Sequence, residues 1–93
     1  MRLESLTNSE KPTKKYKIVF TSPKKTIHFG SKKSSTYLDH KDKSKREAYI
    51  ARHKVNEDWN KINAGSLSRF LLWGDSTDLK TNLNSYKKRF NIT

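Results

Sequence analysis

Residues 49–59, "YIARHKVNEDW", combine an arginine, a histidine and two adjacent carboxylates between two large aromatic residues. His53 and Glu57 are four positions apart, so on a helix their side chains meet on one face. Imidazole and carboxylate groups act as general acids and bases, and both bind zinc. This stretch is therefore the first candidate for chemistry in the chain.

The rest of the sequence does not complete a metal or catalytic site around His53 and Glu57. His28 and His40 could join them as ligands, but there is no HExxH or similarly close-spaced ligand pair. No serine stands in a glycine-flanked elbow, and no glycine-rich loop cradles a phosphate. We expect neither a metal, nor another cofactor, nor an enzymatic activity, and the metal hypothesis stays open as the alternative.

The favoured interpretation of the same stretch is structural. Ion pairs are common near helix ends, so Arg52 is expected to pair with Glu57 or Asp58. Tyr49 and Trp59 would then pack beneath the paired charges. On this interpretation the work of the protein lies elsewhere in the chain.

The elements that position these residues belong to one small domain. The chain has 93 residues, enough for a single core, and no cysteine that could brace it with a disulfide or a thiolate zinc site. Residues 1–13 have only two leucines and one methionine as apolar side chains, and Pro12 separates them from the next segment. We therefore predict a flexible tail over residues 1–13 and a basic α+β domain over residues 14–93.

Two strands are predicted at the start of this domain. Tyr16, Ile18 and Phe20 alternate with less apolar residues, which is the period of a strand. "TSPKK" forms a turn, and "KTIHFG" at residues 25–30 resumes the alternation. The pair predicts a β-hairpin, which needs other elements to cover its apolar face.

About three helices are expected to cover the hairpin, after a polar loop in which Tyr37 and Leu38 either anchor the chain or form a short third strand. Ser44 and Glu47 have the spacing of a capping box for a helix that includes residues 45–54, with Asp42 as the competing cap. A short helix capped by Ser66 and ended by Gly74 comes next in the chain.

In the third predicted helix, apolar side chains recur at steps of four, three and four, which makes one apolar stripe. The stripe consists of Leu79, Leu83, Tyr86 and Phe90. We predict that the centre of the core contains Phe20, Ile27, Phe29, Ile50, Trp59, Phe70, Trp73, Leu83 and Phe90.

Positive charge is concentrated in the middle of the chain. The formal net charge is +12, and residues 14–54 hold 13 of the 21 basic residues and three of the nine acidic ones. Such an excess predicts a polyanionic partner, and the phosphate backbone of nucleic acid is the favoured one. Lysine outnumbers arginine, which favours binding with little sequence preference. The expected phosphate contacts are Lys15, Lys17, Lys24, Lys25, Lys32, Lys33, Lys41, Lys43, Lys45, Arg46 and Arg52.

Five motifs in this order resemble a family of small basic proteins encoded by giant nucleocytoplasmic large DNA viruses. They are "KTIHFG", "YLDHKD", "REAYIARHKVNEDW", "AGSLSRFLLW" and "LNSYKKRFNI". The resemblance covers residues 15–92. That family is functionally uncharacterised, so the resemblance implies a viral protein and no particular activity.

A second hypothesis uses the same charge differently. The protein could be a virion or scaffold component whose basic surface and tail attach to acidic faces of other viral proteins. No apolar segment reaches the length of a membrane span or of a signal-peptide core. We therefore expect no membrane partner and a location inside the infected host cell or in the virion, without secretion.

Overall fold

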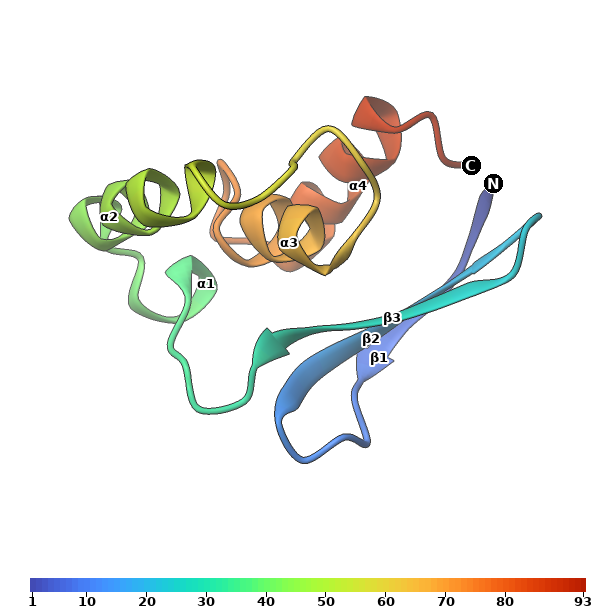
Figure 1. Ribbon diagram of the computed structural model, residues 1–93, viewed down its shortest axis with the longest axis horizontal. Helices are drawn as coiled ribbons and strands as arrows, with labels where there is room; N and C mark the ends of the chain where they lie inside the picture. Colours follow the sequence, from blue (N-terminus) through green and yellow to red (C-terminus); the bar gives the residue numbers. More distant parts are fainter.

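Three antiparallel strands form a sheet from the first third of the chain. The computed structural model describes all 93 residues. The strands are β1 (Arg2–Asn8), β2 (Lys14–Thr21) and β3 (Lys25–Ser31), and β2 lies in the centre. Figure 1 shows the helices gathered on one side of this sheet.

Four α-helices and one π-helix make up the second layer. They are α1 (Tyr37–His40), α2 (Lys43–Lys54), α3 (Ala64–Leu67), η1 (Ser68–Leu72) and α4 (Leu79–Arg89). None of them has both the length and the apolar composition needed to span a membrane. The layered arrangement confirms the predicted α+β class (Figure 1).

The predicted hairpin is present as β2 and β3. Tyr16 pairs with Phe29 across the two strands, and Ile18 pairs with Ile27. Ile18, Phe20 and Phe29 are almost fully buried, because the alternation directs them toward the helices. The sequence period thus predicted both the strands and the face that they bury.

The structure differs from the predicted flexible tail over residues 1–13. Leu3 pairs with Phe20 and Leu6 pairs with Ile18, so β1 is an edge strand of the sheet. Leucines three positions apart would point to opposite faces of a regular strand. The pairing is irregular at Glu4, and this extra residue allows both leucines to pack against the core. The third strand is therefore β1, whereas Tyr37 and Leu38 belong to helix α1.

Two predicted helix starts need correction. The backbone amides of Ser44 and Lys45 donate to the Asp42 carboxylate at 2.9 and 3.3 Å, so Asp42 caps α2 and Ser44 lies within the helix. An aspartate cap is favourable because its negative charge also meets the positive end of the helix dipole.

The middle helix is also capped by a different residue. Asn63 caps α3, and its Oδ1 accepts from the Ser66 amide at 2.8 Å. The Ser66 hydroxyl donates to the Asn63 carbonyl at 3.1 Å and lies 2.8 Å from the hydroxyl of Tyr86. Ser66 therefore joins α3 to α4 across the buried interior and is not the N-cap of α3.

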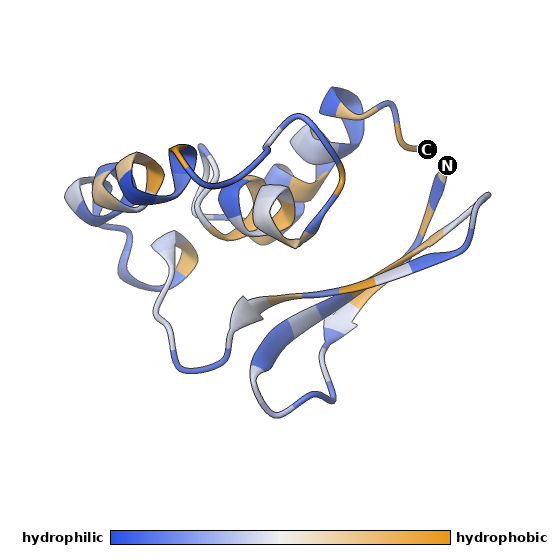
Figure 2. Cartoon of the chain, in the orientation of Figure 1, coloured by the Kyte–Doolittle hydropathy of each residue, from blue (hydrophilic) through white to orange (hydrophobic).

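The core lies between the sheet and the segment α3–η1–α4. Figure 2 shows hydrophobic segments in the middle of the strands and on the helices that face them. Of the predicted core residues, Phe20, Phe29 and Trp73 are buried, whereas the other six are half-buried. These six are Ile27, Ile50, Trp59, Phe70, Leu83 and Phe90.

The residues that replace them at the centre include Leu67, Leu71, Leu72 and Tyr86. In η1 the Trp73 amide bonds to the Ser68 carbonyl, five residues back, which shifts the helix register by one position. Adjacent Leu71 and Leu72 then both face inward, and Phe70 is left at the edge under the Arg89 guanidinium, 4.0 Å from its ring centroid.

Removing residues 1–8 tests whether β1 is part of the folded domain. We expect the free energy of unfolding to fall by several kcal/mol, about half or more of the total for a small domain, because the deletion uncovers Ile18 and Phe20 and unpairs one edge of β2. Urea unfolding measures the change. Unchanged stability would show that residues 1–8 are a dispensable tail.

Candidate nucleic-acid interface and the cleft beside it

Residues 53–59 form a hydrogen-bonded cluster at the end of α2. His53 Nδ1 lies 2.6 Å from Glu57 Oε2, and Trp59 Nε1 donates to Glu57 Oε1 at 2.8 Å. Both carboxylate oxygens therefore have a partner. The predicted ion pair of Arg52 is wrong, because Arg52 is exposed and forms no ion pair, and Asp58 instead lies 3.9 Å from Lys61.

Three aromatic rings stack behind this cluster. The Tyr49 ring is parallel to that of Trp73, with centroids 4.4 Å apart, and the His53 ring stacks on Tyr49 at 4.1 Å. Burial, together with the nearby charge of Glu57, raises the pKa of Tyr49 to about 12. Tyr49 thus stays neutral and packs α2 onto Trp73, whereas the Arg52 ion pair beneath which it was predicted to pack is absent.

The three histidines have separate surroundings. His28 Nδ1 lies 2.8 Å from the hydroxyl of Ser9, whereas His40 Nδ1 accepts from the Asp42 amide at 3.0 Å. No group of three or more histidine, aspartate or glutamate side chains is placed to hold a metal ion. The geometry brings neither His28 nor His40 to the His53–Glu57 pair.

A cleft of about 470 Å³ lies next to His53 and Glu57. One wall is the end of the sheet with the loop after β3, a second is the last two turns of α2, and the third is α3 with η1. Its lining residues are Lys14, Gly30, Ser31, Ser34, Ser35, Thr36, Tyr49, Arg52, His53, Glu57, Ala64, Gly65, Ser68, Leu72 and Trp73.

Two glycines allow the walls to come this close. Gly30 has φ +79°, and an added Cβ would lie 2.8 Å from Leu72 Cδ1. A Cβ on Gly65 would lie 3.1 Å from Glu57 Oε1. Gly30 is thus required by its backbone conformation and by the contact with η1, while Gly65 leaves room for the carboxylate.

Four of the eleven predicted phosphate contacts are engaged within the protein. Lys15 Nζ donates to the Ser34 carbonyl at 2.7 Å and lies 3.6 Å from Asp39. Lys17 pairs with Glu10 at 3.2 Å. Lys25 donates to the Ile62 carbonyl at 3.2 Å, and Arg46 donates to the Gly74 carbonyl at 2.9 Å.

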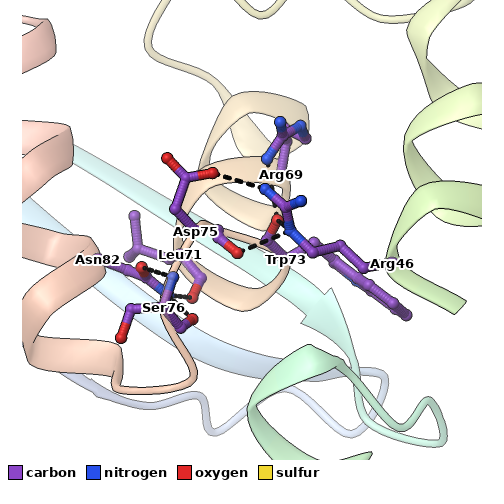
Figure 3. Close-up of polar contacts among 8 residues, drawn as sticks. Arg46, Arg69, Leu71, Trp73, Asp75, Ser76 and Asn82 are labelled. Atoms are coloured by element: carbon purple, nitrogen blue, oxygen red, sulfur yellow. Dashed lines mark hydrogen bonds and ion pairs between the residues drawn. The ribbon is translucent and has the colours of Figure 1, made fainter. Parts of the chain in front are cut away.

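Arg46 is a structural residue. Its Nε donates to the carbonyls of Gly74 and Trp73 at 2.9 and 3.2 Å, and its Nη2 lies 2.6 Å from Asp75 (Figure 3). Only 19% of its side chain is exposed. Because these acceptors already use Nε and Nη2, we leave Arg46 out of the candidate interface.

The remaining seven predicted contacts are exposed and have no ion pair, but they do not form one patch. Lys24 lies in the turn between β2 and β3, at the opposite end of the sheet from Lys32 and Lys33 (Figure 1). The others come after the sheet in the chain, in the α1–α2 turn and on α2: Lys41, Lys43, Lys45 and Arg52. Five of the seven lie in the loop after β3, in the α1–α2 turn and in the first turn of α2, and we call this set the lysine surface: Lys32, Lys33, Lys41, Lys43 and Lys45.

Sequence reasoning missed Lys14 and the serines of the cleft lining. Lys14 belongs to the basic segment but was not among the expected phosphate contacts, and the hydroxyl groups had no expected role. The signal that could have identified them is the run of Ser31, Ser34 and Ser35 directly after Gly30 and around two lysines. Ser68 comes from a different element, so only the fold brings it to the same cleft.

Replacing Arg46 tests its structural assignment. Arg46→Met keeps the apolar stem and should lower the free energy of unfolding by about 1–3 kcal/mol, because the Gly74 carbonyl loses its partner. Asp75→Asn removes only the exposed member of the ion pair and should change stability by less than about 0.5 kcal/mol. Urea unfolding compares them, and equal effects would refute the assignment.

The raised pKa of Tyr49 predicts a pH dependence of stability. The neutral phenol is favoured in the folded state, so its contribution is complete below pH 10 and is lost as the pH rises toward about 12. Tyr49→Phe should therefore lose stability less steeply than the wild type above pH 10. Denaturant unfolding at a series of alkaline pH values measures this, and parallel profiles would contradict it.

The comparison with known families concerns the sheet and most of α2. Residues 4–53 match a family of unknown function (DUF5754). No curated protein and no solved structure matches the chain. The matched residues cover just over half of the chain and include Arg52 and His53, and the protein therefore belongs to this family of unknown function.

Proposed function

We propose that this protein binds DNA or RNA, with little sequence preference and without catalysis, by contact between the lysine surface and the phosphate backbone. The supporting observation is that all five lysines of this surface are exposed and none has an ion-pair partner. Such groups release condensed counterions from nucleic acid when they neutralise its phosphates.

The nearby acidic groups compensate only part of this charge. Asp39 accepts from the Thr36 amide at 2.8 Å, and Asp42 caps α2. Only Glu47 has no such role among the acidic residues of the segment 31–54, which holds eight lysines and arginines. Like charges this close repel one another, and a polyanion relieves that repulsion.

The side chains of the lysine surface suit backbone contact better than base recognition. Lysine offers a flexible point charge, whereas recognition of guanine commonly uses the planar fork of arginine. Arg46 is occupied by backbone carbonyls and Arg69 is partly buried against Trp59 and Phe70. Arg52 is the one exposed arginine of α2.

The resemblance to proteins of giant DNA viruses adds a biological setting to this proposal. In it the protein acts in the infected cell, on viral nucleic acid, or is packaged with that nucleic acid. The competing scaffold role would use the same lysines on acidic viral proteins, so the binding experiment must separate a phosphate backbone from negative charge in general.

Salt dependence of binding tests the proposal. Contacts to about four to six phosphates predict that log affinity falls with log salt with a slope of about −3.5 to −5.5 on duplex DNA. Replacing Lys32, Lys33, Lys43 and Lys45 with glutamine should reduce the magnitude of the slope by about 3 to 4, because four phosphate contacts are lost. Fluorescence anisotropy at several salt concentrations measures both slopes.

A matched control changes the same number of charges elsewhere. Glutamine at Lys11, Lys61, Lys80 and Lys88 leaves the lysine surface intact and should leave the slope almost unchanged. Equal losses from both variants would indicate unspecific attraction to the whole protein. Tighter binding to heparin or to an acidic protein than to nucleic acid would instead support the scaffold role.

A further inference from the structure

The cleft beside His53 contains positive charge that the protein does not neutralise. Lys14 enters it from the start of β2 and Arg52 from α2, and neither side chain has an ion pair or a hydrogen bond within the protein. The one carboxylate in the lining is Glu57, whose two oxygens already accept from His53 and Trp59. The cleft therefore favours an anion.

Hydroxyl groups complete this anion-binding environment. Ser31, Ser34 and Ser35 line the side formed by the sheet and its loop, and Ser68 lines the opposite side from η1. None of these four hydroxyls forms a hydrogen bond within the protein, so each is available to a ligand. Arginine, lysine and serine side chains are common ligands of phosphate oxygens.

His53 contributes a free ring nitrogen. Its Nδ1 is held by Glu57, and 38% of the side chain is exposed. The opposite nitrogen, Nε2, has no partner within the protein, and the residue lines the cleft. Since Tyr49 holds one face of the ring and Glu57 holds one edge, the orientation of this nitrogen is defined before a ligand binds.

The dimensions of the cleft restrict the form of the anion. A volume of about 470 Å³ is within the range of small-molecule sites and accommodates one nucleotide. This volume is too small for a duplex, whereas a single nucleotide at the end of a strand fits it. A terminal phosphate monoester also carries nearly two negative charges, so the two cations, which outnumber the single carboxylate of Glu57, attract it more strongly than a singly charged diester.

We propose that this cleft binds a terminal phosphate monoester, either at the end of a nucleic-acid strand or on a free nucleotide. The inference rests on the proposed function and makes it specific, because Lys32 and Lys33 lie in the same loop as the lining serines. The lysine surface holds the backbone, and Lys14, Arg52 and the serines hold its end.

Binding to three forms of one single-stranded oligonucleotide tests the inference: with a 5′-phosphate, with a 3′-phosphate and with neither. We expect one phosphorylated form to have at least about tenfold higher affinity than the unphosphorylated form, because its phosphate forms additional charge-assisted hydrogen bonds. Titrations with a nucleoside monophosphate and with inorganic phosphate distinguish a strand end from a free nucleotide or a bare phosphate.

Arg52→Gln and Lys14→Gln should each abolish the preference for the phosphorylated form. The matched control is Lys54→Gln, which removes the same charge from an exposed position on α2 outside the cleft and should keep the preference. Thermal unfolding checks that Arg52→Gln still folds, which its exposed and unpaired side chain leads us to expect.

Two results would overturn the inference. Equal affinity for all three oligonucleotides would refute the cleft as a phosphate site while leaving backbone binding by the lysine surface intact. In NMR spectra, phosphate titration that shifts signals of surface lysines but not those of Arg52 and His53 would do the same. A phosphate effect that depends on Arg52, without binding of unphosphorylated strands, would support the cleft and refute the proposed function.

Discussion

The arrangement of the helices depends on how the backbone carbonyls at the end of η1 are hydrogen-bonded. A helix end leaves several carbonyls without partners in the helix, and burial away from water makes unpaired carbonyls costly. Here the Trp73 and Gly74 carbonyls accept from Arg46, Trp73 also accepts from Arg69, and the Leu71 carbonyl accepts from Asn82 (Figure 3). One turn of chain is thus bound to α2 on one side and to α4 on the other.

This constraint divides α2 into two faces. Arg46, Tyr49 and His53 are spaced by three and four residues, so they share the face toward Trp73 and the cleft. Lys43, Lys45 and Arg52 lie on exposed parts of the same helix. The helix can therefore be a wall of the core and part of a cationic surface, because its inward face is held by stacking and by carbonyl contacts.

The cleft results from the same arrangement. Tyr49 and Trp73 keep α2 near η1, while Gly30 lets the end of β3 come close to Leu72. The space left between these elements is lined by unpaired cations and hydroxyls. The carboxylate of Glu57 also lines it and accepts hydrogen bonds from His53 and Trp59. The packing of apolar and aromatic groups thus leaves a polar cleft at the edge of the core.

The sequence by itself determined the elements whose side chains follow a local period. The alternation through Ile18 and Phe20 and the stripe through Leu83 and Tyr86 identify their strand and helix, because these patterns depend only on neighbours in the chain. The concentration of positive charge was equally visible. Only the tertiary structure decided what depends on distant partners: the bulge that turns Leu3 and Leu6 to one side, the use of Arg46 by Trp73 and Gly74, and the cleft. These are contacts between residues far apart in sequence, and no local pattern records which distant groups will satisfy a buried carbonyl or cover an apolar face.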